Sequence, residues 1–247
     1  MTEPVDKAVS LWYAFRRNPY FHFTRKFLTF EPEIVRGALR LGLPLALQWS
    51  LIAISTTALQ TVVNSFGATA VAAYTATNRL EQLVQQPFGS MSMALSTYSG
   101  QNKGAGKTDR IRAGFRDSML AMIVLSAGML VMMQLFGNGL VGLFVHEEDV
   151  IALGGQALKI TSLFYVFLGV IYVTRGVLNG VGDAIFAFIN GAVEIVGRIG
   201  LPLLLLRFTA IGVWAIWITA GLTWMLAGVS CILRYVSWRK KSKARET

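Results

Sequence analysis

The sequence is poor in charge and nearly lacks cysteine. Only 15% of its 247 residues are Asp, Glu, Lys or Arg, whereas 54% are hydrophobic. Because a water-soluble domain of this size carries roughly 25% charge, the composition excludes an ordinary globular enzyme and a disordered chain. The single cysteine, Cys231, excludes an intrachain disulfide and a cysteine metal cluster. What is present, long apolar stretches with 24 dispersed glycines, indicates closely packed membrane helices.

Motifs that carry chemistry are also scarce. Residues 1–40 are too polar and basic for a secretory signal peptide. The run from Gly100 to Thr108 has five residues between its first glycine and Gly-Lys-Thr, whereas a phosphate-binding loop needs four and follows a strand. No His, Cys or acidic cluster has metal-ligand spacing, and no nucleophile stands out with a base. The sequence therefore predicts no catalytic residues, no metal and no cofactor.

Uncharged stretches locate the membrane crossings. A hydrocarbon core about 30 Å thick needs roughly 20 apolar residues, and residues 119–145 and 208–233 contain no Asp, Glu, Lys or Arg. Turn signals at 64–67 and 180–183 divide the other apolar stretches. The chain is predicted to be an all-α membrane protein with a six-span lobe over 41–237, between a basic, aromatic segment 1–40 and a basic tail 238–247. The spans are expected at about 41–64, 68–98, 119–145, 153–179, 184–207 and 211–236.

The basic residues indicate the orientation of the spans. Seven Lys or Arg precede residue 41, five lie in 100–118 and six follow residue 233, which together are 18 of the 23. An even number of spans places these segments on one face, whereas the opposite loop reads His-Glu-Glu-Asp-Val at 146–150. The positive-inside rule then predicts both termini in the cytoplasm. The expected location of the protein is the plasma (inner) membrane. The net charge of +10 is explained by topology and attraction to anionic lipid, so no nucleic acid partner is expected.

Placing an ionisable side chain inside the bilayer costs free energy, so such a residue within a span indicates a functional role or a binding partner. Five are candidates for such a role: Arg79, Glu81, Arg175, Glu194 and Arg198. Glu194 and Arg198 are four residues apart, so they either form a structural ion pair or serve transport. Arg79 and Glu81 point to different sides of their helix and need partners elsewhere.

Glu81 is expected near the middle of the bilayer, about 20 Å along its helix from Gly67. A partly desolvated carboxylate there could exchange a proton during transport. The alternative is a carboxylate neutralised by Arg175 or Arg198. Among uncharged polar residues, Gln48 is a candidate for lining a cavity, and Pro87 is expected to kink the second span.

Three motifs resemble the multidrug and toxic compound extrusion (MATE) transporters. The first is the stretch 70–83, Ala-Val-Ala-Ala-Tyr-Thr-Ala-Thr-Asn-Arg-Leu-Glu-Gln-Leu, followed by Pro87 and Gly-Gln-Asn-Lys-Gly-Ala-Gly-Lys at 100–107. The second is Leu-Gly-Leu-Pro at 41–44 with Gln48, and the third is Arg-Gly-Val-Leu-Asn-Gly-Val-Gly-Asp at 175–183. The motif residues of interest are Pro44, Gly100, Gln101, Asn102, Gly104, Gly106, Gly176, Gly180, Gly182 and Asp183.

The resemblance implies a fold and a function. MATE transporters have twelve spans in two six-helix lobes around a central cavity, and this chain looks like the second, C-terminal lobe. It implies a membrane transporter, not an enzyme, that exports amphipathic or cationic organic compounds in exchange for Na⁺ or H⁺ by alternating access. Small organic substrates, the lipid bilayer, and a missing N-terminal lobe or a second copy are the expected partners.

Alternatives and one departure remain. Ile52 and Leu168 stand where the sodium-coupled branch carries acids, so that ion site is not carried over and the coupling ion stays open. One alternative is half of a lipid-linked precursor flippase of the same superfamily. The other is a truncated lobe that is inactive without a partner lobe.

Overall fold

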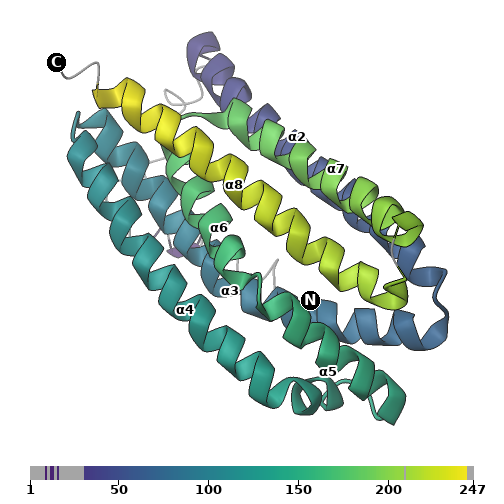
Figure 1. The fold of residues 1–247 in the computed structure, drawn as a ribbon. Coiled ribbons are helices and arrows are strands. Elements are labelled where there is room, and N and C mark those ends of the chain that lie inside the picture. The colour runs from purple at the N-terminus through teal and green to yellow at the C-terminus, as the bar shows by residue number, and fades with distance from the viewer. Residues whose placement is uncertain (1–8, 10–11, 14–15, 17–30, 209, 244–247) are drawn as a thin grey trace. The chain divides into compact units, whose positions relative to one another are not determined.

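The computed structural model describes residues 9, 12, 13, 16, 31–208 and 210–243. The chain divides into two units, residues 1–39 and 40–247, and the second unit contains the lobe. The segment 1–40 lies mostly outside the described residues. All of the described secondary structure is helical, as predicted. Figure 1 shows the helices, which are α2 (Pro32–Asn64), α3 (Ala68–Gly104), α4 (Thr108–Gly142), α5 (Glu148–Ser162), α6 (Tyr165–Gly180), α7 (Ala184–Phe208), the short 3-10 helix η2 (Gly212–Trp214) and α8 (Ala215–Lys243).

Glycines with positive φ form the connections between the helices. Gly67 has φ 90° between α2 and α3, Gly106 has φ 70° between α3 and α4, and Gly182 has φ 80° between α6 and α7. These left-handed conformations cost a residue with a Cβ atom about 1–2 kcal/mol, whereas glycine adopts them freely. The turn signals of the sequence therefore lie where the helices end.

The fourth predicted span is two helices. α5 and α6 meet at an angle of 53° across Leu163 and Phe164, so the expected single helix over 153–179 is broken in its middle. Gln134 of α4 stabilises the break, because its Nε2 donates to the Lys159 carbonyl at 2.9 Å and to the Ser162 Oγ at 3.1 Å. The carbonyl of Lys159, in the last turn of α5, thus accepts hydrogen bonds from Gln134 and from the Ser162 hydroxyl, at 2.9 Å each.

Length and composition qualify α2, α4, α7 and α8 as membrane spans, and the bent pair α5 and α6 as a fifth. α3 is long enough at 37 residues but more polar than the others. It passes through Pro87 without a break in the helix, and the bend expected at this proline stays a prediction. α3 and α4 also extend beyond their predicted spans and meet at Ala105–Lys107.

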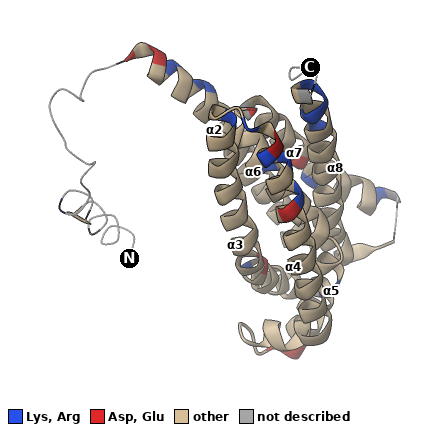
Figure 2. Ribbon diagram, turned by 90° about the vertical axis from the view of Figure 1, so that its left-hand side faces the viewer, with Lys and Arg blue, Asp and Glu red and all other residues tan. Residues whose placement is uncertain are grey.

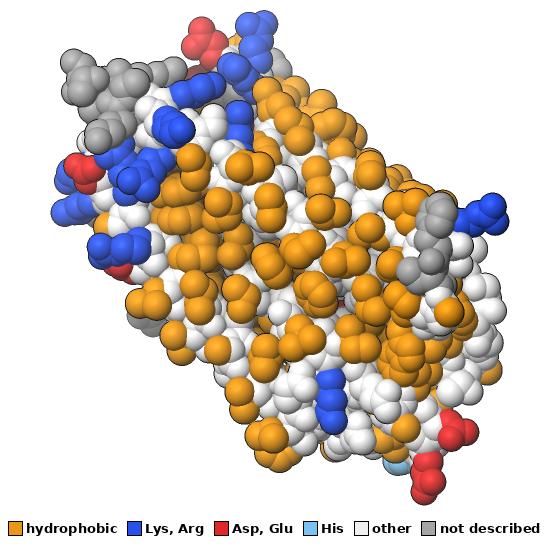
Figure 3. All heavy atoms as spheres, viewed as in Figure 1, with side chains coloured by type: hydrophobic (Ala, Val, Ile, Leu, Met, Phe, Trp, Pro, Cys, Tyr) orange, Lys and Arg blue, Asp and Glu red, His pale blue; other side chains and the backbone are white. Residues whose placement is uncertain are grey.

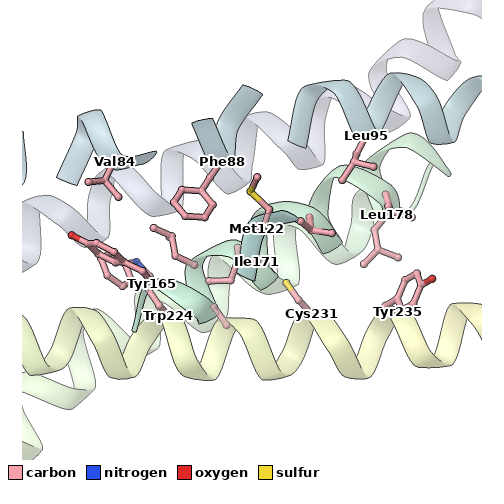
Figure 4. Close-up of a cluster of buried hydrophobic side chains, with 14 of the residues drawn as sticks. Val84, Phe88, Leu95, Met122, Tyr165, Ile171, Leu178, Trp224, Cys231 and Tyr235 are labelled. Carbon is pink, nitrogen blue, oxygen red and sulfur yellow. The ribbon is translucent and has the colours of Figure 1, made fainter. Parts of the chain in front are cut away.

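The core of the lobe lies around α6, which packs against α3, α4 and α8. Figure 4 shows this core, in which Phe88, Met122, Ile171 and Cys231 lie between these helices and Tyr165 of α6 lies beside Trp224 of α8. Phe88 and Tyr165 are completely buried. Burial of such large aromatic side chains stabilises the helix packing, since each buries about 150–250 Å² of surface.

Charged residues gather at both ends of the lobe. Figure 2 shows Lys and Arg gathered where α8 ends, and Arg112 of α4 lies there too, with its Nη2 3.4 Å from the Ser242 Oγ. We call this the basic end. The first turn of α5, at the opposite end, carries Glu148 and Asp149. Between the ends, hydrophobic side chains cover the face over α4, α6 and α8 (Figure 3), as expected for a surface in contact with lipid.

Candidate functional site

A buried polar network joins α6, α7 and α8 inside the lobe. The guanidinium of Arg175 on α6 contacts the carboxylate of Glu194 on α7. Its Nε also donates to Asn190 Oδ1 at 2.7 Å. Only 13% of the Arg175 side chain and 5% of the Glu194 side chain are exposed. An ion pair this deeply buried costs desolvation energy, so its charges need the additional hydrogen bonds that Asn190 provides.

Asn190 connects this pair to α8. Its Nδ2 donates to the Ser230 Oγ at 2.7 Å and to the Ala227 carbonyl at 3.1 Å. Asn190 is itself completely buried, and both ends of its amide are occupied. The network of Arg175, Asn190, Glu194 and Ser230, called the polar network below, therefore fixes three helices at one level.

Arg198 extends the polar network along α7. Its Nη2 lies 3.6 Å from Glu194 Oε2, which is the i,i+4 pair expected from the sequence. Glu194 thus lies between two guanidinium groups and its main partner is Arg175, which the spacing on α7 could not reveal. One negative and two positive charges are gathered here, and a second carboxylate nearby would balance them.

Glu81 of α3 supplies that second carboxylate. The charge of Arg198 acts on it, and the Thr161 side chain of α5 lies beside it. Glu81 forms no ion pair with a described residue, and its buried Oε1 has no hydrogen-bond partner there. The hydroxyl of Tyr165 is likewise buried without a partner among the described residues. Of the two expected neutralising partners, Arg198 acts on Glu81 from outside ion-pair distance and Arg175 binds Glu194 instead.

The other two candidates, Gln48 and Arg79, lie outside this group of charged residues. Gln48 of α2 is 3% exposed and packs on Gly191, where an added Cβ atom would lie 3.1 Å from Gln48 Cγ and 3.2 Å from its Cα. Arg79 of α3 is exposed, two residues from Glu81 but on the other side of the helix. The structure therefore brings Glu81, Arg175, Glu194 and Arg198 together and leaves Gln48 and Arg79 outside the group.

The motif glycines bring α3 and α6 together. A Cβ atom added at Gly176 would lie 2.6 Å from the Ser92 carbonyl oxygen, and one at Gly100 would lie 3.3 Å from the Gly180 carbonyl oxygen. One added at Gly180 would overlap the Ser96 carbonyl oxygen. Small residues at these positions permit backbone contact between the helices.

Two other motif residues, Lys103 and Asp183, hold the turn between α6 and α7 at the basic end by hydrogen bonds. Lys103 at the end of α3 donates to the Val181 carbonyl of this turn. Asp183 accepts two hydrogen bonds from Arg234 of α8, from Nε at 2.7 Å and from Nη2 at 3.0 Å. Asn102 donates to the Tyr98 carbonyl at 2.8 Å within α3. Gln101 and Gly104 are exposed and have no comparable contact with another helix.

Sequence reasoning missed three participants. They are Asn190 and Ser230 of the polar network and Arg234, the partner of Asp183. Asn190 and Ser230 offered no signal, because single polar residues in a span have no spacing that identifies their partners. Arg234 has a weak signal, since it follows a long uncharged stretch and Asp183 precedes α7, but the sequence gives no register between α7 and α8.

Comparisons with known proteins identify the family of the chain. The sequence model of the MatE family matches residues 44–204. Two relatives from Bacillus subtilis are the "probable multidrug resistance proteins" YpnP, 30% identical over 81% of this chain and 45% of its own, and YoeA, 24% identical over 90% and 48%. The chain therefore spans about half the length of the curated relatives it matches.

Solved structures show the same fold. An outward-facing MATE transporter of the MOP superfamily has a TM-score of 0.87 at 20% identity and is matched over 99% of this chain and 55% of its own. A MATE transporter in the bent conformation has a TM-score of 0.85 at 20% identity and is matched over 97% and 55%. Members of this family are transporters and not enzymes. The chain therefore belongs to the MatE family of multidrug efflux transporters, and it corresponds to a lobe of about half the length of the transporters it matches.

Proposed function

We propose that this chain is the second lobe of an ion-coupled exporter of amphipathic organic compounds and that a polar face of α3 lines its transport cavity. Arg79, Gln82 and Gln86 are exposed and follow the i, i+3, i+7 spacing of one helix face. None of the three side chains hydrogen-bonds to a described residue. These three residues are called the polar face of α3 below.

Depth makes this face incompatible with lipid. Arg79 lies 11 residues after the start of α3, about 17 Å along the helix and thus near the middle of a bilayer. An arginine facing hydrocarbon there costs about 3 kcal/mol on insertion scales, and each unsatisfied glutamine amide adds to this. The polar face of α3 therefore needs water or another protein surface.

Other exposed polar residues do not make the same demand. Ser50 and Thr57 of α2 donate to carbonyls four residues earlier in the same helix, at 3.0 and 3.1 Å. Leu135 of α4, Val196 of α7 and Leu233 of α8 are apolar and at least 66% exposed. Contrast between the polar face of α3 and these lipid-compatible surfaces is the single observation that carries the proposal.

The half-length of the chain relative to its curated relatives supports a second lobe as the cover of the polar face. Either an N-terminal lobe or a second copy of this lobe completes the cavity, because the polar face of α3 needs a cover and the curated relatives are about twice as long as this chain. Glu81 and the polar network supply the coupling site for H⁺ or Na⁺, and the two lobes change access by rocking. The basic end faces the cytoplasm of a plasma membrane protein under the positive-inside rule.

An efflux assay tests this function. The chain is expressed alone and fused behind the first lobe of YpnP in a bacterial strain without exporters, and ethidium accumulation is followed by fluorescence. The two-lobe protein is expected to lower accumulation and to lose this effect when the proton or sodium gradient is collapsed. Efflux that survives loss of both gradients contradicts ion coupling.

Arg79 favours a second candidate function. It is the charged residue of the polar face, so this lobe contributes positive charge to the cavity, which favours an anionic headgroup over a cationic drug. The alternative is a flippase for lipid-linked precursors. It is distinguished by movement of a fluorescent lipid diphosphate across a vesicle membrane without effect on ethidium, and Arg79→Gln should reduce that movement.

A further inference from the structure

A groove between α4 and α8 opens at the basic end, apart from the polar network. Its volume is about 620 Å³. Arg112 and Arg116 of α4 and Arg239 of α8 line it together with apolar side chains. We call it the arginine groove. Figure 3 shows Lys and Arg side chains at the edge of the hydrophobic face over α4, α6 and α8, the position of lipid headgroups beside a membrane protein.

Aromatic side chains close the inner side of the arginine groove. Phe115 of α4 and Tyr235 of α8 stack with their ring centroids 3.6 Å apart and an angle of 12° between the rings. Tyr235 is 5% exposed, and the charges of Arg112 and Arg239 both act on it. This ring stacking joins α4 to α8, and the two rings form the base of the groove.

The groove becomes apolar along α4. Arg116, Leu120 and Ile123 follow the i, i+4, i+7 spacing of one helix face, and all three line the groove. Leu120 is 64% exposed and Ile123 is 42% exposed. A molecule lying on this face would therefore meet a guanidinium at one end and hydrocarbon-compatible side chains along its length.

Positive charge exceeds negative charge in the groove. Asp109 is the acidic residue of the lining and pairs with Arg112 at 2.9 Å. Among the described residues Arg116 pairs with its neighbour Asp117, and both side chains are largely exposed, so this contact contributes little. Arg239 forms no ion pair with a described residue. Arg116 and Arg239 remain able to bind an anion.

We propose that the arginine groove is a binding site for one anionic phospholipid. Arg116 and Arg239 bind the phosphate from α4 and α8, because the guanidinium group offers paired donors to phosphate oxygens. One acyl chain lies along Leu120 and Ile123. A free phosphate would satisfy the arginines but leave the apolar wall in contact with water or bulk lipid. The site bridges α4 and α8, and the proposal does not depend on what the lobe transports.

Native mass spectrometry of the full chain in detergent tests the site, with phosphatidylglycerol or phosphatidylcholine as the added lipid. The wild type is expected to retain one phosphatidylglycerol in preference to phosphatidylcholine. Replacing both arginines, R116Q/R239Q, should weaken phosphatidylglycerol binding about tenfold or more. The matched control K240Q/K241Q removes the same charge from exposed residues of α8 outside the groove and should retain binding. Thermal unfolding of each variant checks that it is folded.

Three results would overturn the site. Equal losses in R116Q/R239Q and K240Q/K241Q would show a diffuse attraction of the basic end to anionic lipid. Displacement of the bound lipid by equimolar glycerol phosphate would show an anion site that does not use the acyl chain. Equal retention of phosphatidylcholine by the wild type would show that the groove does not recognise the charge.

Discussion

Arg175 on α6 and Glu194 on α7 are in direct contact although 19 residues separate them in the chain. Asn190 binds the same guanidinium, and Arg198 lies on the other side of the carboxylate. The pair is therefore the centre of a network and not an isolated bridge. Its burial means that each charge is tolerated only because the other is present.

Removal of Glu194 should destabilise the lobe more than removal of Glu194 together with Arg175. Glu194→Gln leaves the guanidinium groups of Arg175 and Arg198 buried without their carboxylate, for which we expect a loss of about 3–5 kcal/mol. The double variant R175Q/E194Q leaves only Arg198 without its carboxylate and should cost less than Glu194→Gln. Thermal unfolding in detergent and the yield of folded protein measure the difference. Additive losses in the double variant would show that the two groups act independently.

Glu81→Gln should remove ion coupling without preventing membrane insertion. Glutamine keeps the size and most hydrogen-bonding capacity of the side chain, but it can neither carry charge nor exchange a proton. In the two-lobe protein we expect gradient-dependent ethidium efflux to fall to the background level. Glu147→Gln removes an exposed acid from the opposite end of the lobe and should leave efflux unchanged. Normal coupling in the Glu81 variant would exclude this carboxylate from the mechanism.

The polar face of α3 should be accessible to water. Cys231 is completely buried, so a cysteine introduced elsewhere reports its own position. Gln86→Cys is expected to react with a hydrophilic maleimide in membranes, whereas Leu135→Cys, 70% exposed on α4, should stay unlabelled because it faces lipid. Equal labelling of the two positions, or none at position 86, would contradict a wet cavity beside α3.

The contact between α3 and α6 should tolerate no methyl group. Gly176→Ala places a Cβ atom 2.6 Å from the Ser92 carbonyl oxygen, which is backbone and cannot rotate away. Overpacking of this kind costs about 1–3 kcal/mol, so the midpoint of thermal unfolding should fall. Gly128→Ala on α4 is the matched control, since nothing lies within 4 Å of its added methyl group. The same midpoint in both alanine variants would show that the helices can separate without cost.

Part of this site could be predicted from residue types alone. Five ionisable residues within apolar stretches mark the candidates, and the i,i+4 spacing of Glu194 and Arg198 gives one true contact. The pairing of Arg175 with Glu194 and of Arg234 with Asp183 could not be predicted. Both join different helices, and helical periodicity contains no information on which helices are neighbours.

The sequence by itself determined that the chain is a bundle of membrane helices, where those helices turn, and which end is basic. These properties follow from the local cost of placing each residue in hydrocarbon, in a turn or beside a charged lipid surface. Only the tertiary structure decided that Glu81 lies inside the lobe while Arg79 lies on its surface. Only the tertiary structure also divides the fourth span at Leu163 and Phe164. Such outcomes depend on the rotation and register of packed helices, which are set by contacts between residues far apart in the chain.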